Sequence, residues 1–142
     1  HVFKIAPKVS EGKVFAVDIQ QEMLNAMKKK KNELSQNNIK LIKGTVKNTK
    51  LPENSVDKVL MVDVYHEFEF PVEMIQSIKN ALRSNGKIYL IEYRAEDPSV
   101  PIKRLHKMTE AQAVKEMNAA GFQLIKNIDN LPWQHCMVFG ID

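Results

Sequence analysis

The sequence is poor in cysteine and has no long apolar run, and each shortage excludes a class of protein. Its single cysteine, Cys136, cannot form an internal disulfide, so a disulfide-stabilised secreted domain is not expected. No apolar stretch reaches the length of a transmembrane helix, and no charged-then-apolar leader indicates a signal peptide. We therefore expect a protein of a reducing compartment, the cytoplasm, with no membrane span.

The length and composition indicate one globular domain. A chain of 142 residues with 44% hydrophobic content can bury one core and is too short for two ordinary domains. No internal repeat and no low-complexity linker divides it. We predict a single domain over residues 1–142.

The basic charge has two interpretations. The formal net charge is +4 and the isoelectric point is about 9.1. Much of this excess comes from a lysine run and from single lysines that follow it, namely Lys28–Lys31, Lys40, Lys43, Lys47 and Lys50. Such lysines could attract phosphate or a membrane surface, or they could form a solvated helix face that complements the helix dipole. No aromatic side chains lie between them to stack on bases, so we do not expect nucleic acid as a partner.

Helical and strand-like segments alternate along the chain. Val2–Val9 is typical of the end of a helix, closed by the turn Ser10-Glu11-Gly12-Lys13. The predicted strands are Val14–Val17, Ile39–Ile42, Lys58–Val62 and Lys87–Glu92. The predicted helices run from Gln21 to Leu34, from Pro71 to a stop at Asn85-Gly86, and from a capping box at Thr109 and Gln112 to Gly121. This order is typical of an α/β fold with a mainly parallel sheet.

The C-terminal part departs from a plain parallel sheet. Two further strands are predicted at Gln123–Ile128 and Cys136–Ile141. Their connection is too short for a crossover helix, so they must form an antiparallel hairpin.

Four stretches occur in an order and spacing that resemble a known family. They are GKVFAVDIQQEML, LPENSVDKVLMVDVYHEF, LRSNGKIYLIEY and MTEAQAVKEMNAAGF, and together they cover nearly the whole chain. They resemble the class I S-adenosylmethionine-dependent methyltransferases, and most closely the branch that contains the ubiquinone and menaquinone biosynthesis methyltransferases.

The resemblance implies a three-layer Rossmann-like methyltransferase fold and an enzyme that uses S-adenosylmethionine. It also implies a small-molecule acceptor, quinone-like or otherwise apolar. Two other functions stay open: methylation of RNA or protein, and a non-catalytic binding module that keeps the methyltransferase fold.

The predicted adenosine site lies after the first two strands. Asp18 ends its strand, where a carboxylate can accept hydrogen bonds from both ribose hydroxyls, although it could instead cap the next helix. Ile19 would lie against adenine in related enzymes, or else pack in the core. Relatives often carry an aspartate near Thr45 and Val46 for the adenine amino group; here the Thr45 hydroxyl or the backbone of Val46 could replace it, or Thr45 could be a plain turn residue.

The predicted methionine and acceptor site follows the third strand. Asp63 interrupts an apolar run and needs a partner, which the ammonium group of the cofactor would supply. His66, in the loop that faces both substrates in this family, is a candidate general base. It could equally be structural, because positioning alone can supply most of the rate of methyl transfer. Tyr65, Glu67, Tyr93 and Arg94 are expected on the same rim as packing or surface residues, and we predict no metal site.

One part of the family pattern is missing. Relatives begin with a strand and a glycine-rich loop that approaches the methionine end of the cofactor, and this sequence resembles them only downstream of that loop. The strand is normally central, between the strands that end at Asp18 and Asp63. We therefore expect two unpaired strand edges, which could pair with each other or with a second copy in a homodimer, and weak cofactor binding by these 142 residues alone.

Overall fold

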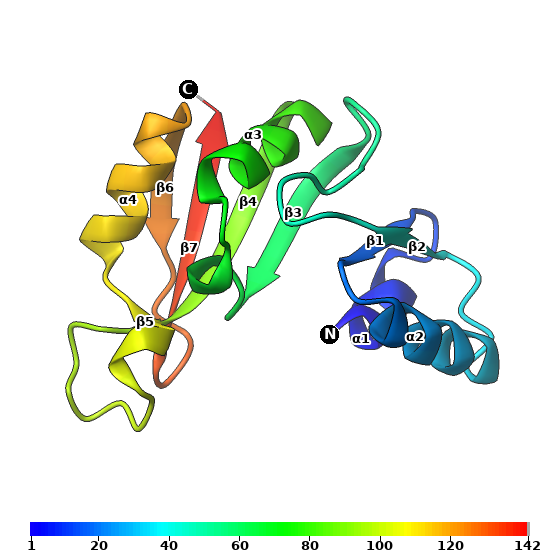
Figure 1. Ribbon diagram of the computed structural model, residues 1–142, viewed down its shortest axis with the longest axis horizontal. Coiled ribbons are helices and arrows are strands. Elements are labelled where there is room, and N and C mark those ends of the chain that lie inside the picture. The colour runs from blue at the N-terminus through cyan, green and yellow to red at the C-terminus, as the bar shows by residue number, and fades with distance from the viewer. Residues whose placement is uncertain (142) are drawn as a thin grey trace. The chain divides into compact units, whose positions relative to one another are not determined.

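The computed structural model describes residues 1–141, which form two compact units that divide between Leu51 and Pro52 (Figure 1). Each unit has its own sheet: two strands in the first unit and five in the second. No helix within residues 1–141 is long and apolar enough to cross a membrane.

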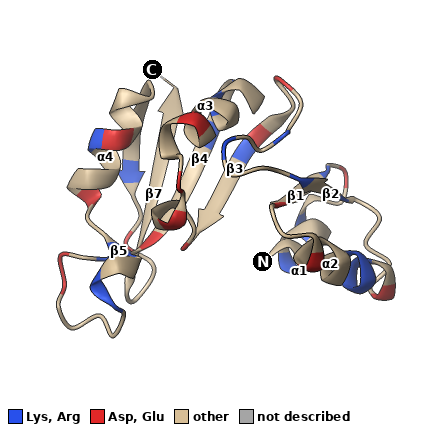
Figure 2. Ribbon diagram, in the orientation of Figure 1, with Lys and Arg blue, Asp and Glu red and all other residues tan. Residues whose placement is uncertain are grey.

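The first unit packs short helices on a small parallel sheet. Its elements are α1 (Val2–Ile5), the 3-10 helix η1 (Ala6–Val9), β1 (Val14–Asp18), α2 (Gln21–Glu33) and β2 (Ile39–Lys43). The two strands are parallel, with Val14 opposite Ile39 and Asp18 opposite Lys43. The Asn38 side chain donates hydrogen bonds to the carbonyl groups of Ala6 and Val9, which ties η1 to the start of β2. A run of lysines, Lys28–Lys31, lies in the C-terminal half of α2 (Figure 2), where it complements the helix dipole.

The second unit contains the main sheet. Its elements in chain order are β3 (Val56–Val62), η2 (Tyr65–Glu67), α3 (Pro71–Ala81), β4 (Leu82–Arg94), η3 (Arg104–His106), β5 (Lys107–Met108), α4 (Glu110–Ala119), β6 (Phe122–Asn127) and β7 (Gln134–Ile141). The strand order is β3-β4-β7-β6, and β5 adds to β4. β4 pairs in parallel with β3 and β5, and antiparallel with β7, which also pairs antiparallel with β6.

The core of this unit lies between the sheet and helices α3 and α4, which cover one of its faces (Figure 1). From Gly86 to Tyr93 along β4, buried and partly buried residues alternate, as a strand with one covered face requires. Ile88 and Leu90 point to the helices and have no exposed surface. Glu92 has the same parity, so the fold buries this carboxylate at the end of the hydrophobic face.

The predicted strands are all present, within a few residues of their predicted bounds, and the antiparallel hairpin at the C-terminus is confirmed. The predicted stop of the third helix at Asn85-Gly86 is wrong, because α3 ends at Ala81 and Leu82 is already extended. Gly86 serves a different purpose. A Cβ atom there would lie 2.6 Å from the Leu82 side chain and 2.9 Å from the Arg83 carbonyl oxygen, so the glycine permits a close approach within β4.

Only one of the two hydrogen bonds of the predicted capping box is formed among the described residues. Thr109 caps α4, since its hydroxyl accepts a hydrogen bond from the backbone N–H of Gln112 at 3.0 Å. The Gln112 side chain does not return this bond, because it donates to Glu116 instead.

The two strands expected to flank the missing strand each have an unpaired edge among the described residues. β1 and β3 belong to different sheets, and within residues 1–141 each pairs with a strand on one side only. The two edges therefore do not pair with each other.

A polar network around the buried His135 joins β7 to the start of α4. The His135 ring lies 2.9 Å from Glu96 through Nε2 and 2.9 Å from the Asn127 amide through Nδ1. Glu96 also accepts a hydrogen bond from the backbone N–H of Glu110. Burial alone would raise the pKa of Glu96, but these hydrogen bonds outweigh it and hold the pKa below its ordinary value.

Candidate active site

Asp63 lies directly after β3, at the end of its pairing with β4. Its backbone N–H still donates to the Ile91 carbonyl group at 2.8 Å, and its φ angle of 53° then turns the chain out of the sheet. Gln134 donates a hydrogen bond to Oδ2 at 2.7 Å. The other oxygen, Oδ1, is buried and has no hydrogen-bond partner among the described residues. A buried carboxylate oxygen without a donor is costly, so this atom is suited to a cationic ligand.

His66 is held by a fully buried carboxylate. Its Nδ1 lies 2.7 Å from Oε2 of Glu92, and its backbone N–H donates to Oε1 of the same residue at 3.2 Å. Burial raises the pKa of Glu92, and the contacts with His66 oppose that shift. Since both oxygens of Glu92 face N–H groups, the carboxylate form with Nδ1 as donor satisfies every atom. Nε2 of His66 is then left with a lone pair.

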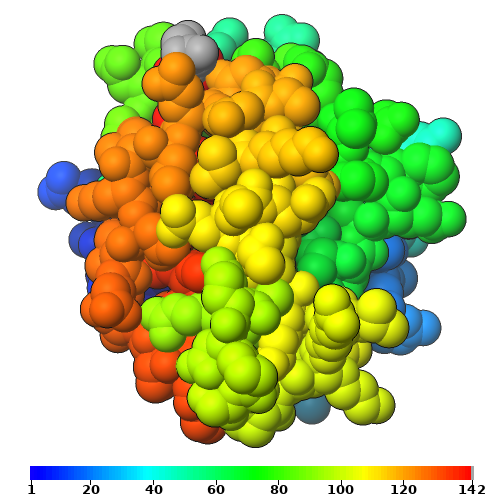
Figure 3. All heavy atoms as spheres, turned by 90° about the vertical axis from the view of Figure 1, so that its left-hand side faces the viewer, coloured from blue at the N-terminus to red at the C-terminus, as the bar shows by residue number. Residues whose placement is uncertain are grey.

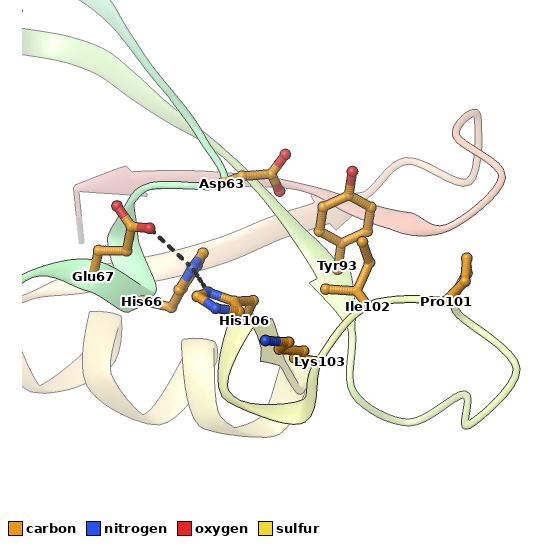
Figure 4. Close-up of a pocket in the computed structure, with 8 residues that line it drawn as sticks. All are labelled: Asp63, His66, Glu67, Tyr93, Pro101, Ile102, Lys103 and His106. Carbon is orange, nitrogen blue, oxygen red and sulfur yellow. Dashed lines mark hydrogen bonds and ion pairs between the residues drawn. The ribbon is translucent and has the colours of Figure 1, made fainter.

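These residues border a cavity of about 480 Å³ at the carboxyl ends of β3 and β4 (Figure 4). Its wall comes from the turn after β3, from the end of β4, and from the segment 95–106 that leads into β5. The lining residues are Asp63, His66, Glu67, Tyr93, Pro101, Ile102, Lys103 and His106. Figure 3 shows the 95–106 segment, in lime green to yellow, on the surface of the molecule below α4. The carboxyl end of parallel strands is where α/β proteins bind their ligands.

The structure brings Asp63 and His66 together at this cavity and changes the roles of two predicted rim residues. Tyr93 and Glu67 line the cavity as expected. Tyr65 instead packs in the core, where its hydroxyl donates to Glu116 at 3.1 Å, and burial raises its pKa well above the usual range. Arg94 is not among the lining residues.

Arg94 has a structural role at the C-terminal hairpin. Its guanidinium donates to the Asp129 carboxylate and to the carbonyl groups of Leu131 and Pro132. These contacts hold the connection between β6 and β7.

The remaining predicted site residues lie in the first unit. Asp18 ends β1 and is half-buried, and its Oδ1 accepts a hydrogen bond from the backbone N–H of Gln20 at 2.9 Å. Gln20, not Asp18, is the N-cap of α2, so the alternative capping role of Asp18 is wrong. Ile19 is 47% exposed, which excludes the alternative of core packing.

Thr45 and Val46 lie in an exposed turn after β2. The Thr45 hydroxyl accepts from the backbone N–H of Lys47, and its own N–H donates to the Asn48 carbonyl group, so it does act as a turn residue. The backbone N–H of Gly44 donates to the Asp18 carbonyl group at 3.0 Å. The turn therefore starts beside Asp18 at one edge of the small sheet.

Glu92 and the cavity-lining residues of the 95–106 segment, of which His106 contacts His66, were missed by the sequence analysis. Glu92 could have been found, because the alternation along the predicted strand gives it the parity of the buried residues Ile88 and Leu90. His106 has no such signal. It is 40 residues from His66 in the chain, yet its Nδ1 lies 3.3 Å from the His66 Nε2.

A family model described as "Methyltransferase domain" matches residues 1–137. None of the curated proteins to which the sequence was compared gave a significant match.

Solved structures show the same fold. The chain is similar to a SAM-dependent methyltransferase from Aquifex aeolicus, with a TM-score of 0.91 at 22% identity, over 99% of this chain and 76% of that one. It is also similar to the pyocyanin biosynthetic protein PhzM (TM-score 0.78, 16% identity, 99% of this chain and 46% of that one). A third is the trans-methyltransferase CalH, solved with SAH (TM-score 0.73, 15% identity, 92% of this chain and 43% of that one).

Proposed function

Because the chain belongs to the methyltransferase-domain family, we propose that it transfers a methyl group from S-adenosylmethionine to a small-molecule acceptor. The methyl group of the donor is bound to a sulfonium sulfur, and an acceptor atom can attack the methyl carbon in line and displace that sulfur. The family match reaches into both compact units, which supports a single domain. We propose that this domain works in the cytoplasm. The free edges of β1 and β3 are where a second copy could pair in a homodimer.

The buried oxygen Oδ1 of Asp63 is the observation that carries this proposal. Its orphaned charge fits the ammonium group of the methionine moiety, and Gln134 keeps the carboxylate oriented through Oδ2. In the first unit, Asp18 would accept hydrogen bonds from the ribose hydroxyls. Ile19, Thr45 and Val46 would border the adenine, with the exposed Ile19 and Val46 as apolar contacts.

His66 would act as the general base at Nε2. As the acceptor atom forms its bond to the methyl carbon, the proton of that atom would pass to Nε2, and the bond from carbon to sulfur breaks. The carboxylate of Glu92 stabilises the resulting imidazolium and holds the ring in place. The products are S-adenosylhomocysteine, the methylated acceptor and a protonated His66.

The cavity wall favours an apolar acceptor with one acidic group. Pro101, Ile102 and the Tyr93 ring provide apolar surface, and His66 lies at the same cavity (Figure 4). Leu105, in the segment that forms one wall, is 88% exposed and could add to this surface. A phenol or hydroquinone would satisfy both requirements.

The test is binding of S-adenosylhomocysteine by calorimetry with Asp63→Asn in the full-length protein. The amide keeps an oxygen for Gln134 but removes the charge, so affinity should fall about 10- to 150-fold, the range for losing a hydrogen bond to a charged group. Asp57→Asn is the matched control, because Asp57 lies on β3, the strand that leads to Asp63, and is an exposed ion-pair partner of Arg83. Equal affinities for both variants would contradict the assignment of Asp63.

A further inference from the structure

Three side chains from two short helices meet at one end of the cavity. His66 and Glu67 lie on η2 and His106 on η3 (Figure 4). The His66 Nε2 atom is 3.3 Å from the His106 Nδ1 and 3.8 Å from Oε1 of Glu67. All three atoms lie within 4.8 Å of one another. We propose that they form a binding site for a divalent transition-metal ion of the zinc type.

The distance between the two imidazole nitrogens already matches a shared metal ion. Two nitrogens bound at about 2.0–2.1 Å in tetrahedral geometry are separated by about 3.3–3.4 Å. His66 and His106 therefore need almost no movement. Oε1 of Glu67 must move closer to the His66 Nε2 by roughly half an ångström and must also approach His106, and the Glu67 side chain is 59% exposed, which leaves it room to do so.

Glu92 prepares His66 for this role. Metal-binding histidines usually donate their second ring N–H to a carboxylate, which fixes the ring and directs the other lone pair to the metal. The Nδ1 of His66 makes this contact with a carboxylate that has no exposed surface. In the absence of a metal, the same lone pair can accept a hydrogen bond from the Nδ1–H of His106, and a metal ion would displace that proton.

The ligand types select the class of ion. Two imidazoles and one carboxylate suit Zn²⁺, Co²⁺ or Ni²⁺, whereas Mg²⁺ and Ca²⁺ prefer all-oxygen ligands. Three protein ligands also leave a position for water or for an atom of a ligand in the cavity. Lys103 adds positive charge to the cavity wall, but its side chain is exposed and can turn to solvent.

This site goes beyond the proposed methyl transfer and competes with it for one atom. While a metal ion is bound to Nε2 of His66, that atom cannot take a proton from the acceptor. No metal site was predicted from the sequence. The 40 residues between the two histidines hide the pair from any search for short-range motifs.

The experiment is a Co²⁺ titration of the untagged full-length protein without methyl donor or acceptor, followed by displacement with Zn²⁺. One equivalent should bind and give the intense visible absorption of four-coordinate Co²⁺. His106→Ala should weaken binding at least about 100-fold, because it removes a ligand outright, and Glu92→Gln about 10- to 100-fold, because it removes the partner of a ligand. His1→Ala is the matched control for an exposed histidine and should bind like the unchanged protein.

His106 is exposed, so its replacement should leave the urea unfolding curve unchanged, and a second variant, His106→Gln, should lose the metal in the same way. Absence of one-equivalent binding would overturn the proposal, and so would binding that survives both His106 variants. Because no methyl donor is present, neither result depends on whether the protein transfers methyl groups.

Discussion

Replacing Glu92 with glutamine should reverse the proton positions on the His66 ring. In the unchanged protein both carboxylate oxygens face N–H groups of His66. The amide of glutamine has one oxygen, and the backbone N–H of His66 can only donate, so that oxygen must face the backbone. The NH₂ group then faces Nδ1, which becomes an acceptor, and the proton moves to Nε2. His66 can then accept a proton or bind a metal through Nε2 only if the proton returns to Nδ1, which weakens both functions.

The expected free energies separate this effect from simple damage to the fold. Two hydrogen bonds to a charged group weaken, which costs about 1.5–3 kcal/mol each at most, but the protein no longer buries a carboxylate, which offsets several kcal/mol. We expect the free energy of unfolding to change by less than about 1.5 kcal/mol, since these two effects largely cancel. Glu92→Ala should cost about 3–5 kcal/mol, because it leaves His66 without its buried partner. The rate of methyl transfer in Glu92→Gln should fall by about 10²- to 10⁴-fold, the usual contribution of a general base.

Long-range proton–nitrogen correlation spectra of the His66 ring provide the assay, since protonated and unprotonated ring nitrogens differ widely in chemical shift. The spectra are taken in alkaline buffer, so that neutral imidazole forms are compared. Glu67→Gln is the control, because Glu67 faces Nε2 at 3.8 Å and does not contact Nδ1. A proton that stays on Nδ1 in Glu92→Gln would refute the reasoning.

Four other outcomes are expected. Asp18→Ala should weaken S-adenosylhomocysteine binding to the full-length protein by about 1–3 kcal/mol in calorimetry, and unchanged affinity would exclude the ribose contact. Thr109→Ala should lower the free energy of unfolding in urea by about 1 kcal/mol, whereas Thr109→Ser, which keeps the cap of α4, should not. Leu90→Ala should lower it by about 2–5 kcal/mol, because Leu90 has no exposed surface; a smaller loss would mean that the core collapses around the gap. Because the pKa of Glu96 is lowered, its contribution to the free energy of unfolding is present above the ordinary glutamate pKa and is lost as the pH falls through the folded-state pKa. Glu96→Gln should therefore make the free energy of unfolding, measured in urea at a series of acidic pH values, fall less steeply with pH, and an unchanged slope would contradict this.

The sequence predicts the elements of this fold well where the hydrophobic pattern and a breaker residue agree. β3 was found because its apolar run is followed by Asp63, where the chain turns. The end of α3 was predicted wrongly at Asn85-Gly86, because a dipeptide that commonly ends helices here permits a close contact inside β4. Local patterns cannot tell these two uses of glycine apart.

Only the site residues that lie close together in the sequence, or that follow from the pattern of one strand, could be predicted. Asp63 and His66 are three positions apart and lie together at the end of one strand, so a strand-end argument finds both. The alternation along β4 predicts that Glu92 is buried on the same face as Ile88 and Leu90, and this pattern can be read from the sequence. The fold of the 95–106 segment brings His106 next to His66, and no spacing of residues in the sequence predicts this contact.

The left-handed backbone at Asp63 narrows the side chains that this position can hold. A φ of 53° suits glycine, asparagine and aspartate, and of these only aspartate provides a charge. The carboxylate therefore extends from the backbone on a short arm with few rotamers, and Gln134 already holds one of its oxygens. Binding at this end of the cavity costs little side-chain entropy, so selectivity for a charged group can be high without the long, mobile side chains that a surface site would use. Any loss of entropy on binding falls instead on the exposed residues of the 95–106 segment, Lys103 and Leu105 among them, which makes that segment the place where acceptor preference can change without disturbing Asp63.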